Sequence, residues 1–350
     1  MAIEDYGWAD RIVHRLAFGS PIPQDLLLDI EQKKHGRAIA AQPLTAPIFV
    51  TALARAGTTL ILEILARHPR LASHTHRDMP FVLTPILWRE LTWRFAVAQE
   101  KKERSHKDGL LVNVDSPEAF EEILWKREFP DHYRADGITP WGPLPEAFTA
   151  KLSRHMKALV LARGGGPEQR YLSKNNANIA RLPGLAQAFP DARFLVPLRH
   201  PVDHARSFLR QHRLGLDSHA ESDFARRYAA DTGHHEFGLV HKPILFDGFD
   251  GQGDATRLDY WLRYWIAAYR AVEAAPRAEL IDMQRFTAAK KAAQLFAHLG
   301  LPLAPEAVAE AEAMIRPIKA YDGTIDADPA LVAAAEALYE RLRADPRCVL

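Results

Sequence analysis

Short apolar runs alternate with longer segments of helical periodicity along most of the chain. A compact apolar run is typical of a buried strand, and apolar positions three or four residues apart are typical of a helix that packs on one side. The predicted strands are residues 47–51, 71–73, 170–173, 192–198 and 278–282. The predicted helices that follow three of them are residues 58–67, 202–213 and 287–299. This alternation favours an α/β fold with a parallel sheet covered by helices.

A long helical stretch, residues 81–162, separates the second and third predicted strands. It is rich in Trp, His and Arg and contains a turn-prone segment at residues 136–145. Open α/β sheets bind their ligands at the carboxyl ends of the strands. We therefore expect this stretch to form a helical cap over that edge, and residues 1–350 to form a single domain.

Composition and charge narrow the choice of partners. The chain has 45 basic and 44 acidic side chains, so it lacks the global field that recruits nucleic acid or an anionic membrane. Its one cysteine, Cys348, excludes an intrachain disulfide and a cysteine-based metal cage, which fits a reducing cytoplasm. The amino terminus lacks the pattern of a secretory signal, and the apolar run 79–88 is about half the length that spans a bilayer. We expect a cytoplasmic protein with no nucleic-acid partner and no membrane span.

Residues 51–59 (TALARAGTT) connect the first predicted strand to its helix. Free backbone N–H groups and the positive end of the helix dipole converge at such a helix start, which favours an anion. Gly57 permits close approach, and Arg55 adds a full positive charge. The nucleotide-triphosphatase pattern GxxxxGK[ST] has Lys where this chain has Thr58. The loop therefore suits a shorter phosphate without metal better than the β/γ junction of ATP.

This loop resembles the 5′-phosphosulfate loop of sulfotransferases that use 3′-phosphoadenosine 5′-phosphosulfate (PAPS), usually written P-[KR]-S-G-T-T. Its matching residues are Arg55, Ala56, Gly57, Thr58 and Thr59, with departures at Ala54 and Ala56. The family's 3′-phosphate motif is an Arg at a strand end and a Ser eight residues later on the next helix. Arg199 and Ser207 match this motif in type, spacing and context. The resemblance implies that both corners bind PAPS as co-substrate, with adenosine 3′,5′-bisphosphate (PAP) as product.

The resemblance extends over about residues 45–320 and includes a distant similarity to tyrosyl-protein sulfotransferases. It implies a three-layer P-loop-type parallel sheet with helices on both faces and a helical cap insertion. The cofactor core would comprise about residues 45–75 and 168–320, and the cap about residues 80–165. Arg316 and Lys319 lie where family members often add basic contacts to the 3′-phosphate, and their role here stays open.

Sulfuryl transfer is an in-line attack on sulfur that parallels phosphoryl transfer, so it needs a base for the acceptor proton and a cation for the departing oxygen. Lys174, at the end of a predicted strand, is the predicted cation. Other family members carry their base just after this lysine, where the chain has Asn176. His76 is the predicted base, because it takes the place of the catalytic carboxylate of tyrosyl-protein sulfotransferases. Asp78 or His74 would orient His76 or replace it.

Other functions fit parts of the pattern. His74, His76 and Asp78 have the spacing of metal ligands, so a metal-dependent hydrolase is one alternative. A P-loop nucleotide kinase or NTPase is a second, and a nucleotide-binding scaffold that lacks a base is a third. For the sulfotransferase we expect no metal, and the acceptor is a hydroxyl or amine on a small molecule, glycan or peptide. The sequence leaves the identity of the acceptor and a homodimer open.

Overall fold

The computed structural model describes residues 7–92, 102–103, 111–112, 116–318, 321 and 323–350. Its centre is a five-stranded sheet in the order β2-β5-β1-β6-β7, and every pair of neighbouring strands is parallel. The strands are β1 (Ile48–Val50), β2 (Leu71–Ala72), β5 (Arg170–Lys174), β6 (Arg193–Leu198) and β7 (Ala278–Asp282). Because β1 is the central strand, the loops that follow β1, β5 and β6 meet at one edge of the sheet.

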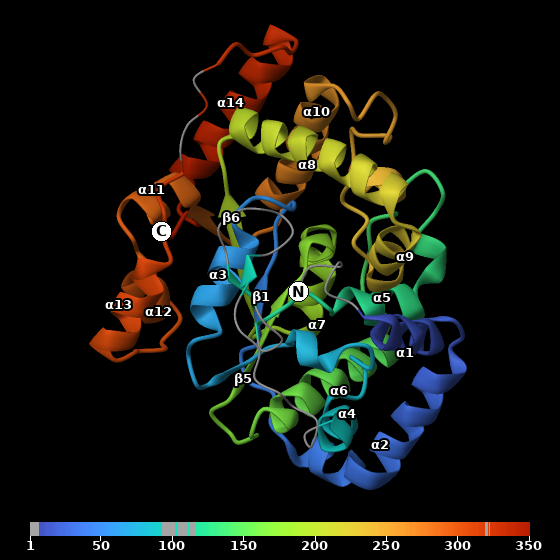
Figure 1. The fold of residues 1–350 in the computed structure, drawn as a ribbon. Helices are drawn as coiled ribbons and strands as arrows, with labels where there is room; N and C mark the ends of the chain where they lie inside the picture. Colours follow the sequence, from blue (N-terminus) through green and yellow to red (C-terminus); the bar gives the residue numbers. More distant parts are fainter. Residues whose placement is uncertain (1–6, 93–101, 104–110, 113–115, 319–320, 322) are drawn as a thin grey trace.

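Helices cover both faces of this sheet and give three layers (Figure 1). The helices are α1 (Trp8–Phe18), α2 (Ile22–Ala41), α3 (Thr58–Leu65), α4 (Pro85–Thr92), α5 (Glu122–Glu128), α6 (Glu146–Ala162), α7 (Leu182–Ala188), α8 (Pro201–Glu221), α9 (Asp223–Thr232), α10 (Leu258–Glu273), α11 (Met283–Ala288), α12 (Ala292–His298), α13 (Pro305–Ala313) and α14 (Pro329–Ala344). The predicted α/β class with a parallel sheet between two helical layers is confirmed.

Alternating side chains of the central strand, β1, pack in two separate hydrophobic cores. Phe49 packs in the core that α6, α7, α10 and α14 share on one face. Ile48 and Val50 pack on the other face, in the core that α3, α12 and α13 share. Successive residues of a strand point to opposite faces, so a fully apolar strand such as β1 requires helices on both sides.

Two local predictions differ from the structure. The segment predicted as one helix at 287–299 is two helices, α11 and α12, because Lys290 has a positive φ of 47° between them. The stretch predicted as a helical cap contains a short antiparallel pair, β3 (Lys102–Glu103) and β4 (Leu111–Val112), and its longest helix, α6, packs in the core under β5. Its role is therefore partly that of a layer helix. Among the described residues no helix combines the length and the apolar character needed to cross a membrane.

Candidate active site

The loop between β1 and α3 turns through two residues with positive φ, Arg55 at 67° and Gly57 at 114°. The positive φ of Gly57 favours glycine, and a Cβ atom there would lie 2.6 Å from the Cε of Met283, whose terminal methyl would have to shift. Gly57 immediately precedes α3, and no described side chain caps this helix start. The first N–H groups of α3 are therefore available to an anion in the loop.

The corner between β6 and α8 lies directly beside this loop. The Arg199 Nη1 atom donates to the carbonyl oxygen of Arg55 at 3.1 Å. The His204 Nε2 atom lies 2.7 Å from the carbonyl oxygen of Ala54 and donates to it, since a carbonyl only accepts. Adjacent parallel strands bring the two corners together, because Val50 of β1 pairs with Leu195 of β6. The two halves of the predicted anion site therefore share one place in the fold.

Four polar atoms of this second corner are buried and lack a hydrogen-bond partner among the described residues: Arg199 Nε, His204 Nδ1, Arg206 Nη1 and Ser207 Oγ. Burial lowers the pKa of the Arg199 guanidinium, and the positive charge of Arg55 adds to the effect, while Asp203 opposes it. Buried donors without partners cost free energy unless a ligand or water satisfies them. The corner therefore has the donors and the positive charge that a phosphate requires.

Lys174 is the last residue of β5 and pairs in register with Val50 of β1. Its side chain is largely buried and lines the same cavity as Arg55, Thr58 and Thr59. The end of β5 thus places a primary ammonium beside the β1 loop. The sequence predicted a cationic lysine at the end of this strand.

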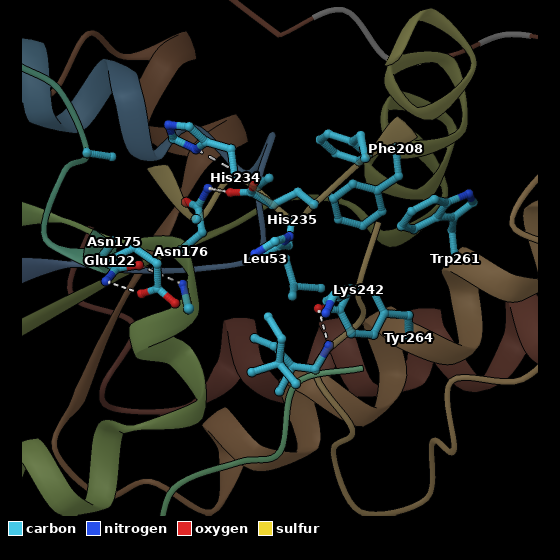
Figure 2. A pocket seen from close by; sticks show the side chains of 18 residues that line it. Leu53, Glu122, Asn175, Asn176, Phe208, His234, His235, Lys242, Trp261 and Tyr264 are labelled. Carbon is cyan, nitrogen blue, oxygen red and sulfur yellow. Dashed lines mark hydrogen bonds and ion pairs between the residues drawn. The ribbon is translucent and has the colours of Figure 1, made fainter. Parts of the chain in front are cut away.

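Asn176 connects the β1 loop to a carboxylate that the sequence analysis did not single out. The Thr58 hydroxyl donates to Asn176 Oδ1 at 3.2 Å, and Asn176 Nδ2 donates to Glu236 Oε1 at 2.7 Å. Burial alone would raise the pKa of Glu236, but the adjacent His234, the positive charge of Lys174 and the bond from Asn176 hold it below its ordinary value. Glu236 is therefore an ionised carboxylate in the wall of the cavity. The close-up in Figure 2 shows His234 and Asn176 on this wall.

Histidines on α8 hold the loop that carries Glu236. The His212 Nδ1 accepts from the Gly238 N–H at 3.2 Å, and the His219 Nδ1 accepts from the Leu239 N–H at 3.2 Å. Burial lowers the pKa of both rings, so both stay neutral at pH 7 and keep the lone pair that accepts.

His76 faces the cavity, whereas the other two candidates of this segment, His74 and Asp78, do not line it. The His76 Nε2 pairs with Glu118 Oε2 at 3.4 Å, and its ring packs edge-on against Phe120. His76, Glu118 and Phe120 all line the cavity. Glu118 is 42 positions further along the chain than His76. It reaches His76 because Thr75 forms an antiparallel bridge with Pro117.

Asp78 and His74 lie in a buried network behind His76. Asp78 Oδ2 accepts from His74 Nδ1 at 2.9 Å and from Arg163 Nη2 at 2.6 Å, and it also accepts from the Thr75 N–H. The His74 Nε2 lies 2.9 Å from the Nε2 of His155, whose pKa burial lowers to about 3. Residues 74–78 are not one extended strand, because His76–Asp78 form a 3-10 turn that Thr75 and Asp78 cap. Asp78 thus stabilises the turn that presents His76, an arrangement that suits the expected orienting role. The choice of base among His76, Asp78 and His74 stays a prediction.

These groups surround one cavity of about 490 Å³. We call it the central cavity. Its described lining includes Arg55, Thr58, Thr59, His76, Glu118, Lys174, His234 and Glu236, and it also includes residues of α8 and α9 between Gln211 and Ala229. From the predicted cap, the described lining has only Glu118 and Phe120. Residues of α8 and α9 therefore contribute much of the described lining.

Metal chemistry at residues 74–78 finds no support in this arrangement. The described residues include no group of three or more His, Cys, Asp or Glu side chains placed to hold one metal ion. His74 faces His155 and Asp78, whereas His76 faces Glu118, so their ring nitrogens do not converge. Arg316 is exposed, and Lys319 lies outside the described residues.

The comparisons with known proteins agree with the geometry. The model of the sulfotransferase family matches residues 47–239, more than half of the chain. The chain therefore belongs to the sulfotransferase family and is an enzyme of that class, as the sequence analysis predicted. No curated protein sequence matches it.

Two solved structures share the fold. Sulfotransferase STF1 from Mycobacterium tuberculosis H37Rv superposes with a TM-score of 0.51 and 16% sequence identity, over 91% of this chain and 82% of that chain. Sulfotransferase STF9 from Mycobacterium avium superposes with a TM-score of 0.50 and 14% identity, over 91% of this chain and 81% of that chain. At this identity the likeness concerns the fold.

Proposed function

We propose that this enzyme transfers a sulfuryl group from PAPS to a hydroxyl or amine acceptor. The observation that carries the proposal is the contact between the two strand-to-helix corners, in which Arg199 donates to the backbone of Arg55. A nucleotide with separate phosphates at its 5′ and 3′ positions needs two adjacent cationic sites of this kind. ATP has no 3′-phosphate, and the loop has Thr58 where an ATP-binding loop has Lys, so the kinase alternative is less well supported.

The residues present fit such a donor. The Gly57 turn and the start of α3 would bind the 5′-phosphosulfate with Arg55, Thr58 and Thr59. The unsatisfied Arg199 Nε and Ser207 Oγ would bind the 3′-phosphate. When bound, PAPS supplies an activated sulfuryl group: a bond from the acceptor atom to sulfur forms while the bond from sulfur to the bridging oxygen breaks, and the nucleotide leaves with that electron pair.

Two side chains in the central cavity suit the remaining roles. Lys174 would stabilise the negative charge that develops on the departing oxygen. His76 would accept the acceptor proton, and the carboxylate of Glu118 beside it would orient the ring and stabilise the imidazolium that forms. Asp78 acts indirectly in this proposal, through the turn that holds His76.

A binding experiment with PAP tests the donor site. Thermal-shift and calorimetric titrations should show that PAP binds and stabilises the protein while ATP does so at least tenfold more weakly. Arg199→Ala removes a charged donor and should weaken PAP binding about 10- to 100-fold, which corresponds to about 1.5–3 kcal/mol. Arg213→Ala is the matched control, because Arg213 lies on the same helix but is exposed and donates to the Thr256 carbonyl. Its effect should stay below about threefold.

The acceptor is found by incubating the purified enzyme with labelled PAPS and pools of alcohols, phenols, sugars and amines, with mass spectrometry to detect sulfated products. Equal affinities for PAP and ATP, or equal effects of the Arg199 and Arg213 substitutions, would contradict the proposed donor.

A further inference from the structure

A second, smaller pocket adjoins the central cavity. Its volume is about 40 Å³. We call it the side pocket. The two cavities have part of their lining in common, namely Ala54, Asn176, His234, Glu236 and Phe237. The side pocket therefore lies behind the wall that carries Glu236, next to the site of the proposed reaction (Figure 2).

Most of the side pocket is apolar, and its polar groups are already bound. Leu53, Phe208 and Trp261 contribute apolar surface. Glu122 accepts from Arg181 at 2.7 Å, and Lys242 donates to the Tyr133 carbonyl at 3.1 Å. The partners of Glu122 and Lys242 thus leave these two groups little capacity for a ligand.

His235 is different. Among the buried side-chain polar atoms in the described lining, its Nε2 is the one without a hydrogen-bond partner. The His235 side chain lines the pocket, and the residue is only 6% exposed. Its Nδ1 lies 3.1 Å from the Val240 carbonyl oxygen, which only accepts, so Nδ1 carries the proton and Nε2 carries a lone pair. Burial lowers the pKa of this ring to about 4, with the positive charge of Lys126 adding to the effect, so the ring is neutral at pH 7.

The structure assigns the side pocket as an acceptor subsite in which His235 Nε2 accepts a hydrogen bond from a second O–H or N–H group of the acceptor. This inference rests on the proposed function, since it concerns the molecule that receives the sulfuryl group. A volume of about 40 Å³ holds roughly three water-sized groups. The subsite therefore fits a short branch of two or three non-hydrogen atoms, with carbon against Leu53 and Trp261 and a donor at its tip. The acceptor class is a diol, a polyol or an amino alcohol.

Specificity should follow from the unsatisfied acceptor atom. A site built to bind a hydroxyl group discriminates strongly against the analogue that lacks it, because the buried polar atom then stays unpaired. A buried hydrogen bond of this kind contributes about 1–2 kcal/mol, which corresponds to a preference of roughly 5- to 30-fold.

Nitrogen-15 NMR of the histidine side chains tests the subsite directly. The probes are ethanol, which has a donor, and acetonitrile, which has the same number of non-hydrogen atoms and no hydroxyl. With PAP bound to the full-length protein, ethanol should shift the His235 Nε2 resonance in a saturable way and acetonitrile should not. No saturable shift with ethanol, or equal shifts with both probes, would mean that the pocket holds only water or any small solvent molecule, and would overturn the assignment.

Two substitutions separate recognition from folding. His235→Asn keeps a donor near the Nδ1 position for the Val240 carbonyl but has no atom at the Nε2 position. His235→Gln places an amide oxygen near that position. For an acceptor identified in the screen and its deoxy analogue, the ratio of kcat/KM values should fall at least fivefold in His235→Asn and recover in His235→Gln. PAP affinity should not change in either variant.

The PAP titration distinguishes the two proposals. If the wild-type enzyme fails to bind PAP, the proposed donor is wrong, whatever His235 does. If PAP binds and turnover is normal but His235→Asn leaves the ratio of kcat/KM values unchanged, the subsite is wrong and the proposed function stands.

Discussion

Replacement of Gly57 by Ala tests the requirement for glycine in the β1 loop. A non-glycine residue in a sparsely populated backbone region costs about 1–3 kcal/mol. The new Cβ atom would also lie 2.6 Å from the Cε of Met283. Because this atom is the end of a flexible side chain, its displacement should cost at most about 1 kcal/mol, the low end of overpacking. We expect Gly57→Ala to lower the free energy of unfolding by roughly 1–4 kcal/mol. Distortion of the turn should also weaken PAP binding at least about tenfold, which is 1.4 kcal/mol.

The two contributions separate in a double-mutant cycle. Met283→Ala removes the methyl group that the new Cβ would meet, but it does not change the φ of 114° at Gly57. The combined Gly57→Ala and Met283→Ala variant should therefore show a coupling free energy of at most about 1 kcal/mol, while the loss of PAP affinity persists. Urea unfolding followed by circular dichroism measures the first quantity, and isothermal titration calorimetry measures the second.

Gly142 provides a matched control, because a Cβ atom there would meet nothing within 4 Å and its backbone is in an ordinary region. Gly142→Ala should change stability by less than about 0.5 kcal/mol. If Gly57→Ala has no larger effect than Gly142→Ala on both stability and PAP affinity, the assignment of the loop as the phosphate site is refuted.

Three further outcomes follow from the site. Lys174→Met should lower kcat about 100- to 1,000-fold with a smaller effect on PAP affinity, because its charge is needed mainly as the leaving oxygen becomes negative. Single-turnover kinetics measure this loss, and a loss of PAP affinity as large as the loss of kcat would contradict the assignment. His76→Gln should lower kcat about 100- to 10,000-fold and leave the PAP thermal shift intact, and near-normal turnover would exclude His76 as the base. Burial lowers the folded-state pKa of His212 and His219 below the ordinary histidine value of about 6.5, so the stability that the neutral rings contribute is fully present above that pH and decreases as the pH falls below it. Hydrogen exchange at the two amides that they bind should therefore accelerate beyond the intrinsic pH dependence between pH 7 and 5, and constant protection would argue against this anchor.

The sheet could be predicted from the sequence because its strands are short, apolar and followed by turns. The runs around Phe49 and Phe194 are buried on both faces, and such strands appear as uninterrupted apolar segments. The break between α11 and α12 could not be predicted in this way. The apolar positions continue through it, and the interruption depends on the positive φ of Lys290, which no periodicity reveals.

The β1 loop, Lys174 and Arg199 were also within reach of sequence reasoning, since each lies at the end of a strand or directly after it. Glu236 and Glu118 were not, because each reaches the cavity through pairings with residues far away in the chain, Asn176 and His76. The one local signal for Glu236 is its place in a His-rich segment, 234–241. The capped 3-10 turn at His76–Asp78 was likewise out of reach, because it depends on burial of Asp78 with His74 and Arg163.

The hydrogen-bonded series from Thr58 through Asn176 to Glu236 has a kinetic consequence. A hydroxyl group has one proton, and in this structure Thr58 gives it to Asn176. A donor phosphate that recruits that proton must release the amide of Asn176, and the amide in turn holds Glu236. We therefore expect the nucleotide to bind first, and the acceptor to bind after Asn176 and Glu236 have changed their hydrogen bonds. Product-inhibition patterns with PAP would reveal this order of binding. Random addition would show that the hydrogen bonds from Thr58 to Glu236 do not couple the two binding steps.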